Sequence, residues 1–391
     1  MADFSSAAQS LPADDNPSQP SFAETPPVPV LMTVRELNFG GIERDVTNIA
    51  LHLDRDRFEV HVASYFPFGI RYDELRASGI PVIALPIGAA FLSRTTIRAA
   101  VVLRQYIQSR RIRIVHAWDN SSVLAVSVAR LCGVPVVLSS VLGHRHLTKP
   151  STVKLLRVMD RMSDAVVVNC DALLHHLAED EAVPLRKLHV CRNGINIHQF
   201  FPGPRDLPQL REVKFVVGTV AVLRPVKAID LLLEAFAQIQ CCLDGMKLVI
   251  VGDGPELSRL QAVQRRLGLE TSCMFVPGAD DIARWLRAMD IFVLPSLSEG
   301  LCNTLLEAMA CGRAVVATRV GGTPELLGDN ERGLLCRPGD ARDLAGKLQL
   351  LINDPVLRNA LADRASNFVR SEMTAERAAR TLSEIYCSLL S

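Results

Sequence analysis

The chain has 391 residues, of which 43 are Lys or Arg, 42 are Asp or Glu, and 49% are hydrophobic. This length exceeds the usual size of a single domain, so two domains are expected. The balanced charge excludes a chain-wide field for nucleic acid, and no apolar run reaches the roughly 18 residues of a membrane span. The ten cysteines show no CxxC pair and no zinc-ligand spacing, which favours reduced core thiols in a cytoplasmic protein.

Residues 1–27 contain acids but no Lys or Arg and are rich in Ser, Pro and Ala, which predicts a disordered extension. Strand-like and helix-like segments then alternate from Val28 to Cys191. This alternation predicts βα units on a parallel sheet with helices on both faces, and such sheets bind ligands at the carboxyl ends of their strands. The glycine pair Gly40-Gly41 and, in the string IVHAWDN, His116 are expected at such ends.

A Pro-rich segment near residue 205 is typical of a linker between domains, and a second alternation of strands and helices follows it. Arg224 and Lys227 stand between the first strand and the first helix of this second domain. Two cations at the carboxyl end of a strand can neutralise a diphosphate leaving group, although a chance surface pair is the simpler alternative.

The stretch from Leu294 to Leu327, LPSLSEGLCNTLLEAMACGRAVVATRVGGTPELL, predicts a strand, a glycine turn and a helix, followed by another strand. The N–H groups of residues 300–304 and the positive end of the helix dipole make this turn a place for phosphate. Glu299 and Glu307 flank the turn. Acids beside an anion are repelled, so these two are best explained if they contact uncharged sugar and ribose hydroxyls. The simpler alternative is that Glu299 offsets the helix dipole and Glu307 is a solvated helix position.

This stretch, with its two glutamates separated by seven residues, closely resembles the retaining glycosyltransferases of family 4. The resemblance implies the GT-B fold, in which two Rossmann-like, doubly wound α/β domains face a cleft. It implies domains at 28–205 and 206–375, with a helix at 376–391 that packs back on the first domain. It also implies transfer of a sugar from a nucleoside-diphosphate-sugar donor to a hydroxyl acceptor, in polysaccharide or glycolipid biosynthesis, without a metal or cofactor.

The resemblance also implies a role for individual residues. The expected catalytic residues are Glu299 at the donor sugar, His116 at a sugar hydroxyl, and Arg224 and Lys227 at the diphosphate. The expected donor-binding residues are Glu307 at the ribose, and Gly40, Gly41, Gly278, Gly300, Leu301, Cys302, Asn303 and Thr304 around the diphosphate and base. Two positions depart from the family pattern, because Trp118 replaces the second histidine of a His-x-His-Asp-like string and Ala228 replaces a glycine.

Two other functions stay open on the same scaffold: a sugar-nucleotide epimerase or hydrolase, and a non-catalytic nucleotide-sugar-binding subunit. The expected partners are a nucleotide-sugar donor and a glycan or lipid-linked acceptor, with no nucleic acid. The basic residues between 143 and 161 are interpreted either as a solvated helix face or as a contact to an anionic acceptor or membrane. With the basic residues at 110–113, the second interpretation implies peripheral contact of the N-terminal domain with the inner membrane face.

Overall fold

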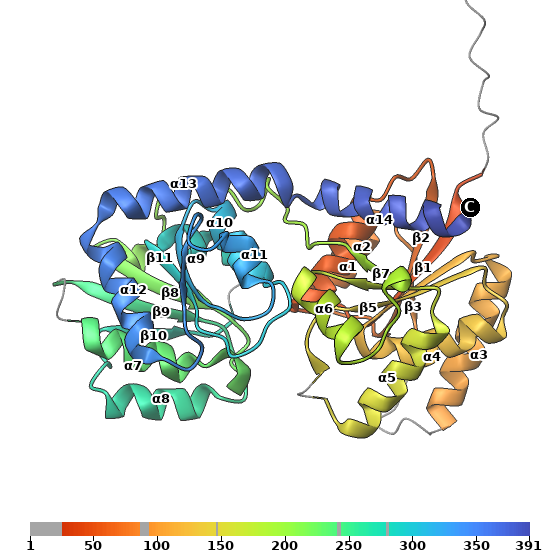
Figure 1. The fold of residues 1–391 in the computed structure, drawn as a ribbon, viewed down its shortest axis with the longest axis horizontal. Helices are drawn as coiled ribbons and strands as arrows, with labels where there is room; N and C mark the ends of the chain where they lie inside the picture. The colour runs from red at the N-terminus through yellow and green to blue at the C-terminus, as the bar shows by residue number, and fades with distance from the viewer. Residues whose placement is uncertain (1–25, 87–93, 146–147, 241–243, 279–280) are drawn as a thin grey trace, which may run out of the picture.

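The computed structural model describes residues 26–86, 94–145, 148–240, 244–278 and 281–391, which form two α/β lobes side by side (Figure 1). The predicted disordered extension lies outside these residues, apart from its last two. Within the described ranges, no helix is both long enough and apolar enough to cross a membrane.

The N-terminal lobe is built on a parallel sheet with the strand order β3-β2-β1-β4-β5-β6-β7. Its described strands are β1 (Val28–Glu36), β2 (Phe58–Phe66), β3 (Val82–Ala84), β4 (Ile114–Trp118), β5 (Val136–Val141), β6 (Ala165–Val168) and β7 (Leu188–Val190). Its helices are α1 (Gly41–His52), α2 (Ile70–Ala77), α3 (Arg94–Ser109), α4 (Ser122–Leu131), α5 (Pro150–Met162) and α6 (Asp171–Glu179), with short 3-10 turns η1 (Asp119–Ser121) and η3 (Leu185–Lys187).

Both faces of this sheet are buried, as expected for a parallel sheet covered by helices. Successive residues of β1 show this, because Val30 and Met32 enter the core beneath α1 while Leu31 enters the core beneath α3 and α4. The near-continuous apolar sequence of β1 therefore reflects two-sided burial.

The C-terminal lobe repeats the scheme with the strand order β10-β9-β8-β11-β12-β13. Its described strands are β8 (Phe215–Val220), β9 (Met246–Val251), β10 (Cys273–Val276), β11 (Ile291–Leu294), β12 (Ala314–Thr318) and β13 (Leu334–Cys336). Its helices are α7 (Ile229–Ile239), α8 (Leu257–Arg266), α9 (Ile282–Ala288), α10 (Asn303–Ala310), α11 (Thr323–Leu327), α12 (Ala341–Asn353) and α13 (Pro355–Glu372), with 3-10 turns η4 (Pro208–Leu210) and η5 (Pro225–Lys227). The expected α/β class with two doubly wound parallel sheets is confirmed.

The last helix, α14 (Ala375–Leu390), returns to the N-terminal lobe, and α13 and α14 together run along one side of both lobes (Figure 1). Thr374 separates the two helices and caps α14, because its hydroxyl accepts a hydrogen bond from the N–H of Arg377. Leu382 and Tyr386 of α14 are fully buried in the N-terminal core beside Phe58. The C-terminus is thus part of the first lobe.

The strand order reverses between β1 and β4 in the first sheet and between β8 and β11 in the second. A crevice forms at the carboxyl ends of strands at such a switch point, because the two connecting loops run to opposite faces of the sheet. Gly40 and Gly41 follow β1, Lys227 follows β8, and Glu299 follows β11. The two switch points therefore carry the predicted site segments.

Candidate functional site

The turn at residues 299–304 joins β11 to α10. Most of it is buried, and its N-cap residue, Cys302, makes no capping hydrogen bond through its side chain. Among the contacts of the described residues, the first N–H groups of α10 therefore stay available to an anion. Gly300 lies so close to the first lobe that an added Cβ would come within 2.2 Å of the main-chain oxygen of Leu142. Only glycine fits this position.

Lys227, from the loop after β8, reaches this turn. Its Nζ donates a hydrogen bond of 2.6 Å to Oε1 of Glu299, and both side chains are largely buried. Burial lowers the pKa of Lys227, but the neighbouring Cys302 and Glu299 outweigh that effect and raise it. Lys227 is therefore a cation at neutral pH. The structure thus brings together Lys227 and Glu299, two residues that the sequence places in the candidate site.

Arg224 lies three residues before Lys227, is exposed, and begins η5. Its charge acts on Lys227 and also on Glu43 of the first lobe, where it opposes the pKa increase that burial causes. Arg224 therefore lies between the two lobes, within electrostatic reach of both. Two cations on one short loop next to uncapped N–H groups concentrate positive charge, which is the charge that an anionic ligand requires.

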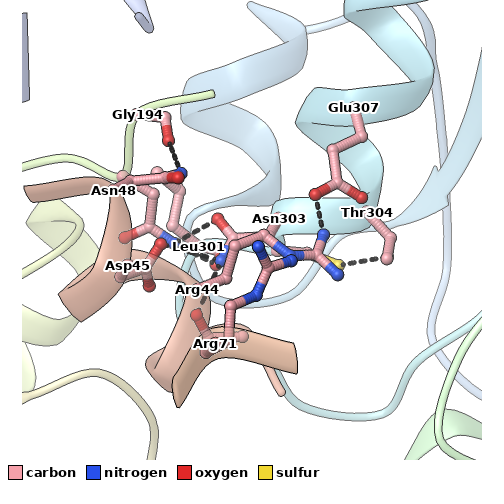
Figure 2. Close-up of polar contacts among 12 residues, drawn as sticks. Arg44, Asp45, Asn48, Arg71, Gly194, Leu301, Asn303, Thr304 and Glu307 are labelled. Carbon is pink, nitrogen blue, oxygen red and sulfur yellow. Dashed lines mark hydrogen bonds and ion pairs between the residues drawn. The ribbon is translucent and has the colours of Figure 1, made fainter. Parts of the chain in front are cut away.

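Glu307 lies in α10 and is fully buried. Arg44, in the first turns of α1 of the other lobe, forms an ion pair with its carboxylate (Figure 2). Burial lowers the pKa of Arg44 to about 10, so it remains charged at neutral pH. The ion pair occupies Oε1 of Glu307, and within the described part of the chain Oε2 has no hydrogen-bond partner. Oε2 can therefore still accept a hydrogen bond from a ligand hydroxyl.

Asn303 connects the two lobes at the start of α10 (Figure 2). Its amide nitrogen donates to Oδ1 of Asp45 at 2.8 Å and to the carbonyl oxygen of Gly41 at 3.1 Å. Its amide oxygen accepts from Asn193 at 2.8 Å, and Asn193 also donates to the carbonyl of Leu301 at 3.1 Å. The predicted donor-binding residue Asn303 is thus occupied by contacts between the lobes.

Gly40 and Gly41 form the N-terminus of α1, where Gly40 is the N-cap residue. The carboxylate of Glu43 folds back onto Gly40, so closely that an added Cβ would overlap it. Burial raises the pKa of Glu43. The glycine pair therefore lies beside an acid. It also faces Asn303 of the turn at residues 299–304, as the hydrogen bond from Asn303 to the Gly41 carbonyl shows.

His116 lies elsewhere. It is expected at the end of its strand, but β4 continues to Trp118, and the His116 side chain is fully buried. Its Nδ1 is 2.8 Å from the hydroxyl of Tyr386 in α14, and its Nε2 is 2.7 Å from Oγ of Ser140 in β5. Burial lowers its pKa to about 3, so the ring is neutral. The structure does not bring His116 together with the other site residues, and its role at a sugar hydroxyl stays a prediction.

Gly278 follows β10 in an exposed segment with no neighbouring heavy atom near its Cβ position. Hydrogen bonds connect this strand end to the site through the 252–254 turn. The N–H of Gly252 donates to Val276, and the N–H of Leu223, next to Arg224, donates to the carbonyl of Asp253 at 2.8 Å. Gly278 therefore borders the site rather than lying in it, and its place in a base pocket stays a prediction.

Several site residues were missed by the sequence reasoning because they act between the lobes. Arg44 and Asp45 are buried charges near the start of α1, a helix that also carries Glu43, Thr47 and Asn48, so the sequence does not distinguish them from solvated helix positions. Glu325, in the GGTPE string, accepts hydrogen bonds from the N–H groups of Asp171 and Ala172 at the start of α6. These contacts depend on how the lobes meet, which no local pattern predicts.

The described residues hold no group of three His, Cys, Asp or Glu side chains that could bind a metal ion. The eight described cysteines are all free thiols. The charged groups of the site are instead paired with each other: a lysine with a glutamate on one side, and an arginine with a glutamate on the other.

Two family models match the chain. Residues 39–199 match the model "Glycosyltransferase Family 4", and residues 205–368 match "Glycosyl transferases group 1". Together they account for most of both lobes.

Curated relatives are similar over part of their length. The N-acetyl-alpha-D-glucosaminyl L-malate synthase of Bacillus anthracis is 30% identical over 247 residues, which are 62% of this chain and 64% of the relative. A D-inositol 3-phosphate glycosyltransferase of Kribbella flavida is 30% identical over 235 residues, 55% of each chain. The matched region thus spans less than two thirds of these relatives.

Solved structures share the fold over nearly the whole chain. HepE of Anabaena, in complex with UDP and glucose, has a TM-score of 0.82 at 23% identity and covers 92% of this chain and 99% of its own. A sucrose-phosphate synthase of Thermosynechococcus elongatus has a TM-score of 0.79 at 20% identity, with 93% and 99% covered. The two-lobed GT-B architecture, the site turn between its lobes and the two matching models agree, and the chain belongs to the group 1 glycosyl transferases of glycosyltransferase family 4.

Proposed function

We propose that the protein transfers a sugar from a nucleoside-diphosphate-sugar to a hydroxyl acceptor with retention of anomeric configuration. The observation that carries this proposal is the pair of Lys227 and Glu299 at the uncapped start of α10, with Arg224 on the same loop. Such a site combines positive charge for a diphosphate with a carboxylate for sugar hydroxyls. The proposed transfer reaction rests on these residues of the chain itself.

In this proposal the diphosphate lies between the two cations and the first N–H groups of α10. Charge accumulates on the diphosphate as the bond between the sugar C1 and the phosphate oxygen breaks, and fixed cations stabilise that charge. The acceptor oxygen forms its bond to C1 on the same face, and its proton passes to the departing phosphate oxygen. Glu299 and Glu307 then hold sugar and ribose hydroxyls, and no side-chain nucleophile is needed.

Ligand entry requires that existing ion pairs rearrange. Lys227 contacts Glu299, and Arg44 contacts Glu307, in the same places where phosphate and hydroxyl groups are proposed to bind. A diphosphate can replace Glu299 as the partner of Lys227, which frees the carboxylate for the sugar. A ribose hydroxyl can bind Oε2 of Glu307, which has no partner among the described residues.

The comparisons with known proteins suggest candidates for the donor base and the acceptor. HepE, a structural neighbour, is solved with UDP and with UDP-glucose, which makes a uridine donor the first candidate. The names of the relatives give malate and inositol 3-phosphate as hydroxyl acceptors of those proteins. For this chain we propose a glycan or lipid-linked acceptor, which would bring the N-terminal lobe into peripheral contact with the inner membrane face.

The test is release of nucleoside diphosphate and formation of glycoside from UDP-, GDP- and ADP-sugars, with and without candidate acceptors. These acceptors are malate, inositol 3-phosphate and lipid vesicles that carry sugar headgroups. We expect acceptor-dependent glycoside formation, and Glu299→Gln should lower kcat about a hundredfold or more because transition-state contacts of this kind have that size. Glu270→Gln, an exposed control in the same lobe, should have no effect.

Three results would contradict the proposal. Turnover that never depends on an acceptor would favour a hydrolase or an epimerase. Nucleotide binding without any turnover would favour a binding subunit. Full glycoside formation by Glu299→Gln would remove Glu299 from the site.

A further inference from the structure

The basic segment between 143 and 161 is partly neutralised by ion pairs. The Arg145 side chain is largely buried and forms ion pairs with Asp160 at 2.8 Å and Glu181 at 3.0 Å. Arg157 of α5 also pairs with Glu181, at 3.2 Å. Two of the five Lys and Arg residues between 143 and 161 are therefore paired with acids, whereas Lys149, Lys154 and Arg161 are exposed.

The helices α3, α4 and α5 form one layer over a face of the N-terminal sheet (Figure 1). The sequence from 86 to 162, which contains this layer, has twelve Lys or Arg residues and two acids, Asp119 and Asp160. A chain with net charge +1 thus concentrates positive charge in one layer of one lobe. Such a field attracts an anionic partner.

The outer face of α3 combines this charge with apolar side chains. Ile97 is 68% exposed and Val101 is 47% exposed, one helical turn apart. Arg94, Arg98 and Arg104 are exposed on the same helix. Within the described residues, none of these three arginines forms an ion pair, and α3 contains no acidic residue.

The outer face of α5 repeats the combination. Leu155, Val158 and Met162 are 38–44% exposed and recur at helical spacing, while Lys154 and Arg161 are exposed beside them. The one acid of this helix, Asp160, points inward and is fully occupied by Ser139 and Arg145. Two faces of this layer, on either side of α4, therefore present apolar stripes bordered by cations. We call these faces, on α3 and α5, the α3–α5 surface.

We propose that the α3–α5 surface binds an anionic lipid bilayer. Apolar side chains between Lys and Arg are the pattern of a helix that lies in the interface of a membrane, with the apolar groups below the headgroups and the cations at the phosphates. The exposed apolar residues favour a bilayer over a nucleic acid, because a phosphate backbone offers them no apolar contact. This surface is distinct from the donor site.

The location of the α3–α5 surface fits a membrane-bound acceptor. In parallel βα units the helices begin at the carboxyl edge of the sheet, so Arg94 and Lys154 lie near the same edge as Gly40 and Gly41. That edge faces the turn at residues 299–304, as the hydrogen bond from Asn303 to the Gly41 carbonyl shows. A bilayer on this surface would hold the first lobe with its acceptor edge near the headgroups.

This inference rests on the membrane contact of the proposed function, but its test measures sedimentation of the full chain with large vesicles and needs no nucleotide. Vesicle binding and sugar transfer can therefore fail separately. Vesicles of phosphatidylcholine alone are compared with vesicles that contain one third phosphatidylglycerol. We expect binding to the anionic vesicles only, and weaker binding at high salt because salt screens charges. Each cation near an anionic surface contributes about 1 kcal/mol, so Arg98→Gln with Lys154→Gln should lower the partition coefficient about 30-fold.

The matched control removes two exposed arginines elsewhere, Arg265→Gln with Arg370→Gln, and should bind like the wild type. Replacing Ile97 and Val158 by Gln tests the apolar part and should also weaken binding about tenfold or more. Both sets lie on the surface, so the melting temperature should stay unchanged. Three results would overturn the proposal. The control variant could lose as much vesicle binding as Arg98→Gln with Lys154→Gln, or the wild type could bind neutral vesicles as well as anionic ones. The wild type could also bind an RNA oligonucleotide but not vesicles.

Discussion

The ion pair between Arg44 and Glu307 joins the two lobes, and its removal has a predictable cost. Arg44→Met keeps the apolar stem of the side chain but leaves the fully buried carboxylate of Glu307 without its cation. Breaking a buried pair by removing one partner costs about 3–5 kcal/mol. Because Arg44 is only 7% exposed, we expect a loss of about 3 kcal/mol in the free energy of unfolding at pH 7.

The reverse change should cost less. In Glu307→Gln the side-chain amide oxygen can still accept a hydrogen bond from Arg44, so a loss of about 1–2 kcal/mol is expected. The double variant contains no unpaired charge at these two positions. Its loss should therefore be smaller than the sum of the single losses, by about 1 kcal/mol or more.

Urea denaturation followed by tryptophan fluorescence measures this cycle, because Trp118 lies in the first lobe and Trp285 in the second. Arg265→Met on the surface of α8 is the control and should stay within about 0.5 kcal/mol of the wild type. A loss below about 1 kcal/mol for Arg44→Met, or strictly additive losses in the double variant, would refute the reasoning that the pair is buried and coupled.

Three further predictions test other parts of the structure. Burial raises the pKa of Asp45 to about 7, so the folded state holds this proton more tightly than the unfolded state. The free energy of unfolding of the wild type should therefore fall as pH rises from about 4 to about 7. Asp45→Asn should flatten that part of a melting-temperature profile and raise stability at pH 8. Tyr386→Phe should cost about 1–3 kcal/mol in urea denaturation, because it removes the hydrogen bond to a buried histidine, and it should leave nucleotide binding unchanged. Gly321→Ala should lower the melting temperature, because Gly321 has a φ of +49° and an added Cβ would lie 2.1 Å from the main-chain oxygen of Glu299. Gly346→Ala should raise the melting temperature, because Gly346 lies inside α12 with open space around its Cβ position. Flat profiles in the wild type, or equal effects of the two glycine changes, would contradict these expectations.

The local parts of the site could be predicted from the sequence. An apolar run, a glycine turn and a helical pattern predict β11 and α10 where the structure has them, because each follows from the period of its own side chains. Lys227 and Glu299 meet because their loops follow β8 and β11, which are neighbours at the switch point of the sheet. The sequence predicts that both loops lie at strand ends, but not the ion pair between these two side chains.

Contacts between distant segments could not be predicted in this way. His116 resembles a strand-end site residue, but its partner Tyr386 is 270 positions away in a helix that returns from the other lobe. The pairing of Arg44 with Glu307, and of Asn303 with Asp45, depends on how two separate lobes dock. Sequence periodicity describes each lobe by itself and carries no information about that docking.

Binding of nucleoside diphosphates tests the central claim most directly. Isothermal titration of UDP, GDP and ADP should show that one of them binds, and Lys227→Met should weaken it about 10- to 100-fold, because a hydrogen bond to a charged group contributes about 1.5–3 kcal/mol. Lys214→Met, at the opposite end of the same strand and exposed, should bind like the wild type. If none of the three binds, or if Lys227→Met binds as tightly as the wild type, the cleft beside α10 is not a diphosphate site and the proposed transfer reaction fails with it.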